Sequence, residues 1–313
     1  GAADSTCCVA SCNVAKLIDS MITPQKFAVS FERFAGNPIL KPDANHLWES
    51  RAVFNPAAFF DGKKTHIVYR AMSQDNTSVF GYAAIKNGVR VIERGKEPIY
   101  LPRGSFEQKL NPGGNSGCED PRITRIGNTL YMCYTAYDGK NPPRVALSSI
   151  SVQKFLRHEW DWAPPIMISP PGYDDKDACI FPQKVGGKYI VLHRIGNCID
   201  FAIVDSLQFS ENHWLEEHKW LRPRRGFWDS LKVGIASPPL KTSDGWILLY
   251  HGVSVEDHGY RVGALLLDSR DPERILARTE NPILEPEASY EKEGQVSNVV
   301  FPCGAAIIGK KLF

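Results

Sequence analysis

Phe54-Asn55-Pro56 begins an apolar segment that ends at Phe60, and Gly62 separates this segment from a second strand-like stretch. A Pro that enters one apolar strand and a Gly that precedes the next are typical of a β-hairpin with glycine at its turn. The same Pro recurs at intervals of 56 to 65 residues, in Glu119-Asp120-Pro121, Ile180-Phe181-Pro182, Ala236-Ser237-Pro238 and Val300-Phe301-Pro302. The matching glycines are Gly127, Gly187, Gly245 and Gly309. This period indicates five copies of one structural unit.

A third marker, a Pro-Ile segment, stands near the end of each unit. It occurs as Pro38-Ile39-Leu40, Pro98-Ile99-Tyr100, Pro165-Ile166-Met167 and Pro282-Ile283-Leu284, and in degenerate form as Trp220-Leu221-Arg222-Pro223. The alternative, a chance recurrence of common Pro and Gly positions, does not explain the agreement of these markers. Five strand-rich units with little helical periodicity predict an all-β, five-bladed β-propeller rather than a sandwich. We expect one domain over residues 1–313.

Composition excludes several classes of partner. Lys and Arg number 37 against 35 Asp and Glu, a net charge of +2, which does not favour nucleic-acid binding. No apolar run reaches the roughly 18 residues of a membrane span. The eight cysteines form no C-x-x-C pair and have no histidine at metal-ligand spacing. We therefore expect reduced core thiols, no metal, no membrane partner and a cytoplasmic location.

One helix is predicted outside the ring. From Asn13 to Met21, the apolar residues Val14, Leu17, Ile18 and Met21 fall on one helical face. Asn13 is a favourable N-cap, and Pro24 follows the helix. We expect this helix to pack against the outside of the propeller.

Polar residues gather at one end of the predicted strands. The first two inner strands begin with Asn55 and Glu119-Asp120, Lys176-Asp177 precedes the third, and the second strands end at Arg70, Arg194 and His251. Taken singly, these residues are as compatible with structural ion pairs as with function. Because equivalent strand ends of a propeller converge around its axis, together they indicate an anion site beside an acid.

These same positions resemble glycoside hydrolase family 130, the β-mannoside phosphorylases and their hydrolytic relatives. The resemblance covers nearly the whole chain, and its most specific parts are Glu119-Asp120-Pro121-Arg122 and the segment from Asn298 to Gly304. Further matching segments are Trp48-Glu49, Ala52 to Pro56, Tyr69-Arg70-Ala71, Lys176-Asp177-Ala178, Leu192-His193-Arg194, Gly245-Trp246 and Tyr250-His251-Gly252. The resemblance implies a five-bladed propeller that needs no cofactor and uses inorganic phosphate as co-substrate.

The two ends of the sequence depart from the family pattern. Family members close with a Tyr-Tyr-Gly-Ala-Ala-Asp stretch, a strand and a helix, whereas this sequence begins with Gly1-Ala2-Ala3-Asp4 and ends at Phe313. We expect a circularly permuted order in which residues 1–22 complete the last blade, beside Val299 to Phe313, and supply the outer helix. Residues 1–12 would then bring Asp4 to the central site. An unrelated leader segment is the simpler alternative.

The resemblance also implies roles for individual residues. Asp120 corresponds to the single general acid, and Lys176, Arg194 and His251 correspond to phosphate-binding positions. Asn55, Arg70 and Asp4 correspond to residues that hold the mannosyl group, and we expect Glu119 and Tyr250 to contact the sugar as well. Tyr250 and Tyr137 are suited to stacking on sugars, although tyrosines at strand ends are equally often core residues.

Three functions compete at this point. The first is a β-mannoside phosphorylase, formally a glycosyltransferase, which forms α-mannose 1-phosphate from a β-mannoside oligosaccharide and phosphate with inversion. The second is an inverting β-mannosidase, which needs a second carboxylate as base and neutral groups in place of the phosphate cations. The third is a sugar-binding propeller without catalysis, for which loss of Asp120 would be expected. The cations and the acid together favour the first. The linkage, the acceptor sugar and a homo-oligomeric state stay open.

Overall fold

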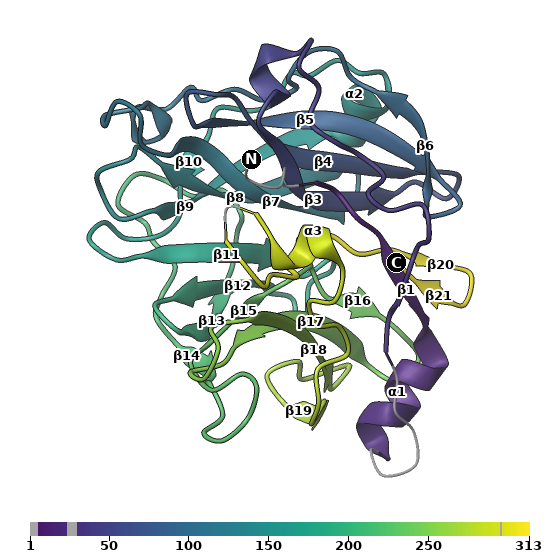
Figure 1. The fold of residues 1–313 in the computed structure, drawn as a ribbon. Coiled ribbons are helices and arrows are strands. Elements are labelled where there is room, and N and C mark those ends of the chain that lie inside the picture. The colour runs from purple at the N-terminus through teal and green to yellow at the C-terminus, as the bar shows by residue number, and fades with distance from the viewer. Residues whose placement is uncertain (1–5, 24–29, 295) are drawn as a thin grey trace.

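The computed structural model describes residues 6–23, 30–294 and 296–313, and its strands form five blades around a central axis (Figure 1). Blades 1 and 2 are joined into one sheet by a short parallel pairing between their strands at Thr77–Ser78 and Ser116–Gly117. Blade 1 contains β3 (Ala52–Phe60), β4 (Thr65–Met72), β5 (Thr77–Lys86) and β6 (Arg90–Arg94). Blade 2 contains β7 (Ser116–Ile126), β8 (Thr129–Tyr137), β9 (Arg144–Ser151) and β10 (Ile166–Met167). Blade 3 contains β11 (Asp175–Ile180), β12 (Tyr189–Ile195), β13 (Cys198–Val204) and β14 (Lys219–Leu221).

Blade 4 contains β15 (Lys232–Ile235), β16 (Leu240–Lys241), β17 (Trp246–Val253), β18 (Tyr260–Leu267) and β19 (Ile275–Arg278). Blade 5 contains β20 (Ile307–Ile308), β21 (Lys311–Leu312), β1 (Ala10–Asn13) and β2 (Glu32–Arg33). The helices are α1 (Val14–Ile22), α2 (Val152–Leu156) and α3 (Ser289–Lys292), with 3-10 turns at Leu47–Glu49 and Ser105–Glu107. The predicted five-bladed β-propeller is confirmed. Among the described helices, none combines the length and apolar composition needed to cross a membrane.

The predicted glycine turns lie between the inner strand of each blade and the strand that follows it; in blade 4 the inner strand is divided into β15 and β16, and Gly245 stands between β16 and β17. Gly127, for example, stands between β7 and β8 with a φ of +60°, and Gly309 stands between β20 and β21 with a φ of +61°. Residues with a Cβ rarely adopt this left-handed conformation, so glycine is favoured at both turns. The hairpin interpretation is therefore confirmed.

The Pro marker proved less regular than the sequence indicated. Pro56 and Pro121 lie inside β3 and β7, where two residues oppose one residue of the neighbouring strand. In blade 3 this position is occupied by Asp177 and Ala178, and Pro182 follows the end of β11. The expectation that Pro182 marks the entry into the third strand was wrong, because the equivalent position there carries alanine.

These irregular positions are β-bulges that turn a polar side chain toward the axis. Asn55, Asp120 and Asp177 have φ values of +49°, +52° and +56°. Asn and Asp are the side chains that adopt the left-handed region most readily after glycine. A bulge re-aims the side chain of the extra residue, and three equivalent bulges therefore present three polar groups to one central space.

Each Pro-Ile segment forms the outer pairing of its blade. Ile99 donates its N–H to the carbonyl of Phe80 in β5, and Ile283 donates to the carbonyl of Val262 in β18. The Pro165 segment supplies β10, and Ile39 pairs with Cys7, just before β1. The third sequence marker thus identifies the edge of the sheet in each repeat.

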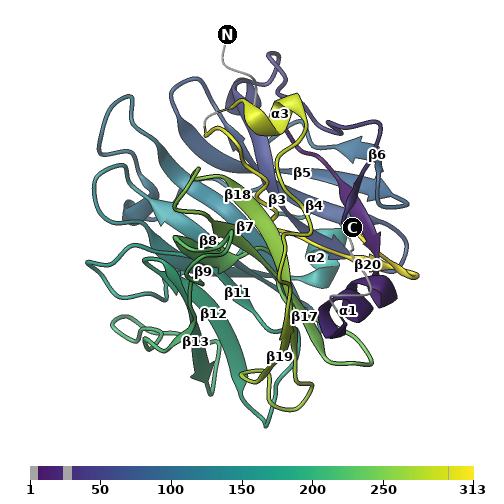
Figure 2. The ribbon, with the colours of Figure 1, turned by 60° about the horizontal axis from the view of Figure 1, so that its bottom comes forward.

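Blade 5 combines strands from the N-terminal and C-terminal regions of the chain. Strand β1 lies between β2 and β21, with Cys12 paired to Leu312 and Ala10 paired to Arg33. Figure 2 shows β20 and the C-terminus close to helix α1, which follows β1 in the chain. Closing a propeller with strands from distant segments leaves no long open sheet edge. This pairing supports our proposal of one domain over residues 1–313, with residues 1–22 completing blade 5. The N-terminal residues 1–5, including Asp4, lie outside the described residues.

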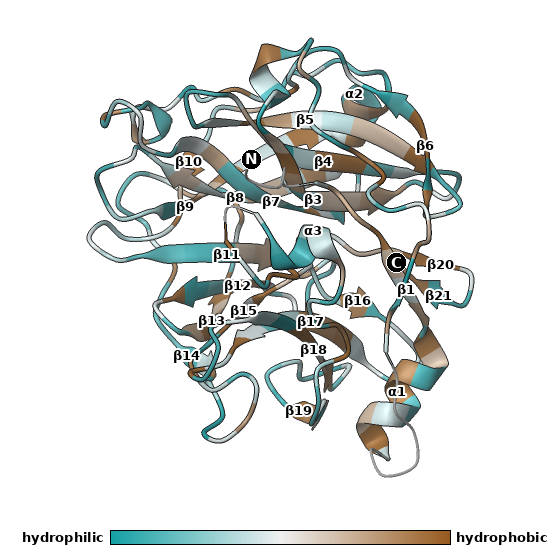
Figure 3. Cartoon of the chain, viewed as in Figure 1, coloured by the Kyte–Doolittle hydropathy of each residue, from teal (hydrophilic) through white to brown (hydrophobic). Residues whose placement is uncertain are grey.

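Helix α1 follows the prediction closely. The side chain of Asn13 accepts a hydrogen bond from the N–H of Lys16 at 3.1 Å, as an N-cap does. Leu17, Ile18 and Met21 are buried, in one apolar cluster with residues of β17 and β18, and Figure 3 shows polar colour between the apolar residues of the helix. The helix therefore covers the outside of blade 4. All eight cysteines are free, and seven of them are buried, as expected for core thiols.

A buried guanidinium connects three blades at the axis. Arg122 of β7 is 1% exposed and donates to the carbonyls of Ile235 (2.6 Å), the last residue of β15, and Ala236 (2.9 Å), the next residue. It also donates to the Asp120 carbonyl at 3.0 Å and lies 3.3 Å from a carboxylate oxygen of Asp177. Because buried polar groups are costly when unpaired, this one side chain ties blades 2, 3 and 4 together.

We expect Arg122→Met to lower the free energy of unfolding by about 3 kcal/mol or more, because it removes half of a buried ion pair and a donor to three backbone carbonyls. Arg125→Met, on the exposed part of the same strand, is the matched control and should change stability by about 0.5 kcal/mol or less. Urea unfolding of both variants measures the difference. Equal effects would show that Arg122 does not hold the blades.

Candidate active site

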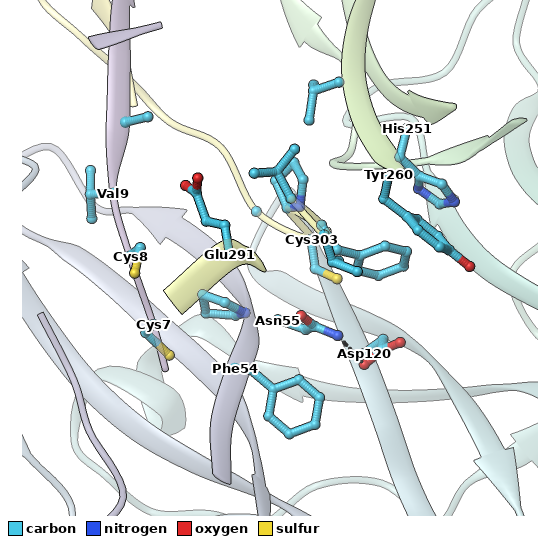
Figure 4. Close-up of a pocket in the computed structure, with 18 of the residues that line it drawn as sticks. Cys7, Cys8, Val9, Phe54, Asn55, Asp120, His251, Tyr260, Glu291 and Cys303 are labelled. Carbon is cyan, nitrogen blue, oxygen red and sulfur yellow. Dashed lines mark hydrogen bonds between the residues drawn. The ribbon is translucent and has the colours of Figure 1, made fainter. Parts of the chain in front are cut away.

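A cavity of about 520 Å³ lies where the inner strands begin, and it extends toward blade 5 (Figure 4). Its wall includes residues from β3, β4, β7, β11, β12 and β17, the strands that carry the predicted site. Seven of those predicted residues line it: Asn55, Arg70, Glu119, Asp120, Lys176, Arg194 and His251. The structure thus brings together residues that are as much as 196 positions apart in the sequence.

Side chains of the protein bind only one of the two carboxylate oxygens of Asp120 within the described residues. The amide of Asn55 donates to Asp120 Oδ1 at 2.8 Å, and Arg70 Nη1 donates to the same oxygen at 3.1 Å. No residue of the described ranges donates a hydrogen bond to Oδ2, and the side chain remains 14% exposed. One carboxylate oxygen is therefore fixed by the protein while the other is available to a ligand.

Arg70 links Asp120 to its neighbour Glu119. Arg70 Nη2 donates to Glu119 Oε1 at 2.7 Å, and Nε donates to Ser78 Oγ at 2.9 Å. Burial raises the pKa of Glu119, and the charge of Asp120 raises it further, against the opposing effect of Arg70. The guanidinium thus has a fixed orientation between two carboxyl groups.

Asp177 organises the opposite wall. Arg194 Nε donates to Asp177 Oδ2 at 2.6 Å, Arg122 approaches the other oxygen at 3.3 Å, and His251 Nε2 lies 3.6 Å away. Burial alone would raise the pKa of Asp177, but Arg194 and Arg122 lower it well below its usual range. This carboxylate is therefore ionised and neutralises part of the charge of both arginines.

His251 differs from the expectation of a phosphate-binding cation. Its side chain is fully buried against the Tyr260 and Phe301 rings, whose centroids are 5.7 and 4.5 Å away. Burial lowers its pKa to about 3, and Arg194 and Arg122 oppose protonation further, although Asp177 favours it. His251 is thus neutral near pH 7, and it can donate one hydrogen bond but supplies no charge.

Lys176 is the freest of the predicted cations. It is half-buried, and among the described residues it has no hydrogen-bond or ion-pair partner. Lys232 and Tyr260 also line the cavity, with Lys232 Nζ 2.6 Å from Tyr260 Oη. The sequence analysis missed this pair, although Lys232 stands near the start of the fourth inner strand, where the repeat places other site residues.

Tyr250 and Tyr137 are not among the residues that line the cavity. Tyr250 is fully buried, and its hydroxyl donates to Asp229 Oδ2 at 2.8 Å while accepting from Arg278. Successive residues of a strand face opposite sides, so the placement of His251 in the cavity turns Tyr250 away from it. We therefore leave both tyrosines out of the proposed site, and Asp4 lies outside the described residues.

One group of possible metal ligands occurs among the described residues: Asp43, His46 and Glu49. It lies outside the residues that line the cavity. Glu49 is buried and already pairs with Arg94 at 2.8 Å and Tyr69 at 2.8 Å. A cation bound there would compete with the Arg94 guanidinium, so this group fits an ion-pair network better than a metal site.

The buried, neutral state of His251 predicts a loss of stability in acid. The unfolded state takes up a proton as the pH falls below about 6.5, whereas the folded state does so only near pH 3. Wild-type protein should therefore lose about 2 kcal/mol more stability between pH 7.5 and 5 than His251→Asn. Denaturant unfolding at several pH values measures this difference. Parallel stability curves for the two proteins would contradict a neutral His251.

Comparison with known proteins places this site in a family. The model of glycoside hydrolase family 130, described as β-1,4-mannooligosaccharide phosphorylase, matches residues 30–313. A 1,2-β-oligomannan phosphorylase of Thermoanaerobacter sp. (strain X514) is 36% identical over 286 residues, covering 89% of this chain and 90% of the relative. A β-1,2-mannobiose phosphorylase of the same strain is 37% identical over 289 residues, covering 87% and 88%.

A solved family 130 structure has the same fold. It has a TM-score of 0.72 and 28% identity, covering 90% of this chain and 88% of the other. Its description states that this family of mannoside phosphorylases contains glycoside hydrolases that target β-1,2 mannosidic linkages in Candida mannan. The family model and both Thermoanaerobacter relatives extend over most of the propeller, including the residues around Asp120. The chain belongs to glycoside hydrolase family 130.

Proposed function

We propose that the protein is a β-mannoside phosphorylase that transfers a mannosyl group to inorganic phosphate with inversion. The products are α-mannose 1-phosphate and a sugar shortened by one residue. The observation that carries this proposal is the placement of one half-free carboxyl group, Asp120, in the same cavity as the cations Lys176 and Arg194. The names of the two Thermoanaerobacter relatives favour β-1,2-linked mannosides as the substrate class.

Asp120 acts as the general acid in this proposal. Cleavage of a glycosidic bond requires a proton on the leaving oxygen, and one positioned carboxylic acid supplies it. Asn55 and Arg70 fix Asp120 Oδ1, so that Oδ2 is the oxygen that carries the proton toward the substrate. Phosphate is already an anionic nucleophile and attacks the anomeric carbon from the opposite face. No carboxylate base is therefore required.

The phosphate site is proposed to combine charge with neutral donors. Lys176 supplies an unpaired ammonium, and Arg194 retains donors that Asp177 does not use. His251, as a neutral imidazole, contributes at most one donated hydrogen bond. Lys232 and the Tyr260 hydroxyl stand beside His251 and extend the same wall. Charge-assisted hydrogen bonds of this kind compensate for the lost hydration of phosphate.

The mannosyl group is proposed to lie over Asn55, Arg70 and Glu119. Their amide, guanidinium and carboxyl groups offer both donors and acceptors to sugar hydroxyls. Asp4 stays in the proposal only through the family resemblance. A cytoplasmic location is also proposed, because eight free thiols are expected to persist where the environment is reducing.

Hydrolysis is the second candidate, and the solved relative described above makes it worth testing. An inverting hydrolase needs a carboxylate free to activate water on the far side of the sugar. Asp177 is bound by Arg122 and Arg194, and Glu119 is bound by Arg70. These two carboxylates beside Asp120 are engaged, whereas Lys176 is free, so this part of the cavity favours an incoming anion over an activated water. Of the other lining carboxylates, Glu291 of α3 is bound by Arg33 of β2, and Glu293 follows α3 on the blade 5 side of the cavity.

The proposal predicts that release of mannose 1-phosphate from β-1,2-mannobiose depends on inorganic phosphate. Products with and without phosphate distinguish the three candidates: mannose 1-phosphate for a phosphorylase, mannose in either condition for a hydrolase, and no product for a binding protein.

Asp120→Asn should remove at least 99% of activity, about a hundredfold effect, because an amide cannot donate the proton. Asp205→Asn, at an exposed carboxylate, is the matched control. Near-normal turnover by Asp120→Asn would reject this acid.

We expect Lys176→Gln to raise KM for phosphate about tenfold to a hundredfold, because a charged hydrogen bond contributes about 1.5 to 3 kcal/mol. KM for the mannoside should change much less, since Lys176 is assigned to the anion. Lys184→Gln, an exposed lysine that lies over Tyr189 in the same blade, controls for loss of positive charge. Initial rates at varied phosphate measure the effect. An unchanged KM for phosphate would remove Lys176 from the phosphate site.

A further inference from the structure

Opposite each of the three inner-strand bulges lies a buried side chain of the neighbouring strand that binds an acidic residue. Tyr69 opposes the bulge at Asn55, Tyr134 opposes the bulge at Asp120, and His193 opposes the bulge at Asp177. Each of these side chains is buried and bonded to a buried acid. The pairs are Tyr69 with Glu49 at 2.8 Å, Tyr134 with Glu107, and His193 with Asp175 at 2.9 Å. The bulges that form the site are thus each supported from behind by a polar pair.

Blade 3 differs from the other two because its supporting side chain can titrate near neutral pH. A buried tyrosine keeps its proton throughout the physiological range, whereas an imidazole does not. His193 is immediately followed by Arg194, and Asp175 is immediately followed by Lys176. Lys176 and Arg194 are themselves direct partners across β11 and β12. The titratable pair is therefore one residue away from both proposed phosphate cations.

A second carboxylate completes this cluster. Asp200 of β13 is the direct cross-strand partner of His193, and all three side chains are 0% exposed. His193 Nε2, Asp175 Oδ1 and both carboxylate oxygens of Asp200 make no hydrogen bond of good geometry within the described residues, although the backbone of Glu216 lies near His193 and that of Ile195 lies near Asp200. Two buried carboxylates with so few donors require a nearby positive charge or a proton. The imidazole between them is the group placed to hold it.

The surrounding charges act on the same cluster. Burial alone would lower the pKa of His193, but Asp175 and Asp200 raise it above its usual value. Burial also raises the pKa of Asp200, against the influence of His193. The other charged groups that face the cluster are Arg144 of β9, which interacts with Asp175, and Glu217 and Lys219 at the β14 edge, which interact with Asp200. Two thiols also face it: Cys133 of β8 interacts with Asp175, and Cys198 of β13 interacts with Asp200.

We propose that His193 is a positioning residue for phosphate binding, which together with Asp175 and Asp200 holds Lys176 and Arg194 and makes phosphate affinity depend on its protonation. This inference rests on the proposed phosphorylase function. When His193 loses its proton, the cluster loses one positive charge directly behind the phosphate cations. Phosphate binding therefore weakens as the pH rises through the titration of His193. The contacts that orient the general acid Asp120 do not involve this cluster.

The test compares wild type with His193→Tyr, which repeats the tyrosine–acid pair of blades 1 and 2 and cannot titrate in this range. The ratio of KM for phosphate, wild type over variant, is measured from pH 6 to 8.5, so that the titration of phosphate itself cancels. We expect the ratio to rise roughly threefold to tenfold, with little change in the kcat ratio. His193→Phe, which cannot donate to Asp175, should raise KM at every pH. A flat ratio would overturn the proposal.

Two further measurements keep this inference separate from the function on which it rests. Asp200→Asn is nearly isosteric and should move the KM transition to lower pH, because it removes a charge that favours protonated His193. The imidazole titration, followed by NMR and assigned as the resonance missing from His193→Tyr, needs no turnover, and calorimetry measures inorganic phosphate binding directly. Absence of mannose 1-phosphate would reject the phosphorylase alone. A His193 that does not titrate between pH 5 and 9 would reject the positioning role alone.

Discussion

The left-handed bulge in three inner strands is the constraint on which the site depends. A regular strand would point Asn55, Asp120 and Asp177 along the pleat, where alternate side chains enter the interfaces between blades. The extra residue turns each of them toward the axis, with φ near +50°. That conformation costs roughly 1 kcal/mol for a residue with a Cβ, so the surrounding structure must compensate for it. The site is thus built from the backbone before any side chain contributes chemistry.

The compensation comes from buried polar contacts behind the bulges. Glu49, Glu107 and Asp175 each receive the side chain opposite a bulge, and Arg122 binds two carbonyls of blade 4 together with Asp177. Such groups are expensive to bury singly but rigid when paired, because every alternative arrangement leaves some of them unsatisfied. The propeller therefore places its strongest internal polar contacts immediately behind the cavity, where positional accuracy matters for catalysis.

The Pro and Gly period was sufficient to predict five blades, because turn residues respond to local backbone geometry that repeats in each unit. Helix α1 could also be predicted from its N-cap and its apolar face. The position of the third bulge could not be predicted, because Ala178 replaces the proline found at Pro56 and Pro121. Tyr250 was predicted to contact the sugar, but neighbouring strand residues face opposite sides, and in the structure His251 is the one that lines the cavity. The neutrality of His251 depends on burial, which no motif records.

The balance of charge around the axis explains how one cavity can receive both a neutral sugar and an anion. Within the described residues, five cationic side chains lie near the three carboxylates Glu119, Asp120 and Asp177: Arg70, Lys176, Arg194 and Lys232 line the cavity, and Arg122 lies behind its wall. Toward blade 5 the wall also carries Arg33, Glu291 and Glu293. His251 is neutral and adds no charge, so around Asp120 the cations outnumber the carboxylates. Arg70 and Arg122 are committed to carboxylates and backbone carbonyls, so the surplus resides on the Lys176 and Lys232 wall. Phosphate is thereby drawn to one side of the cavity, while Asn55 and Asp120 on the other side remain available to the sugar.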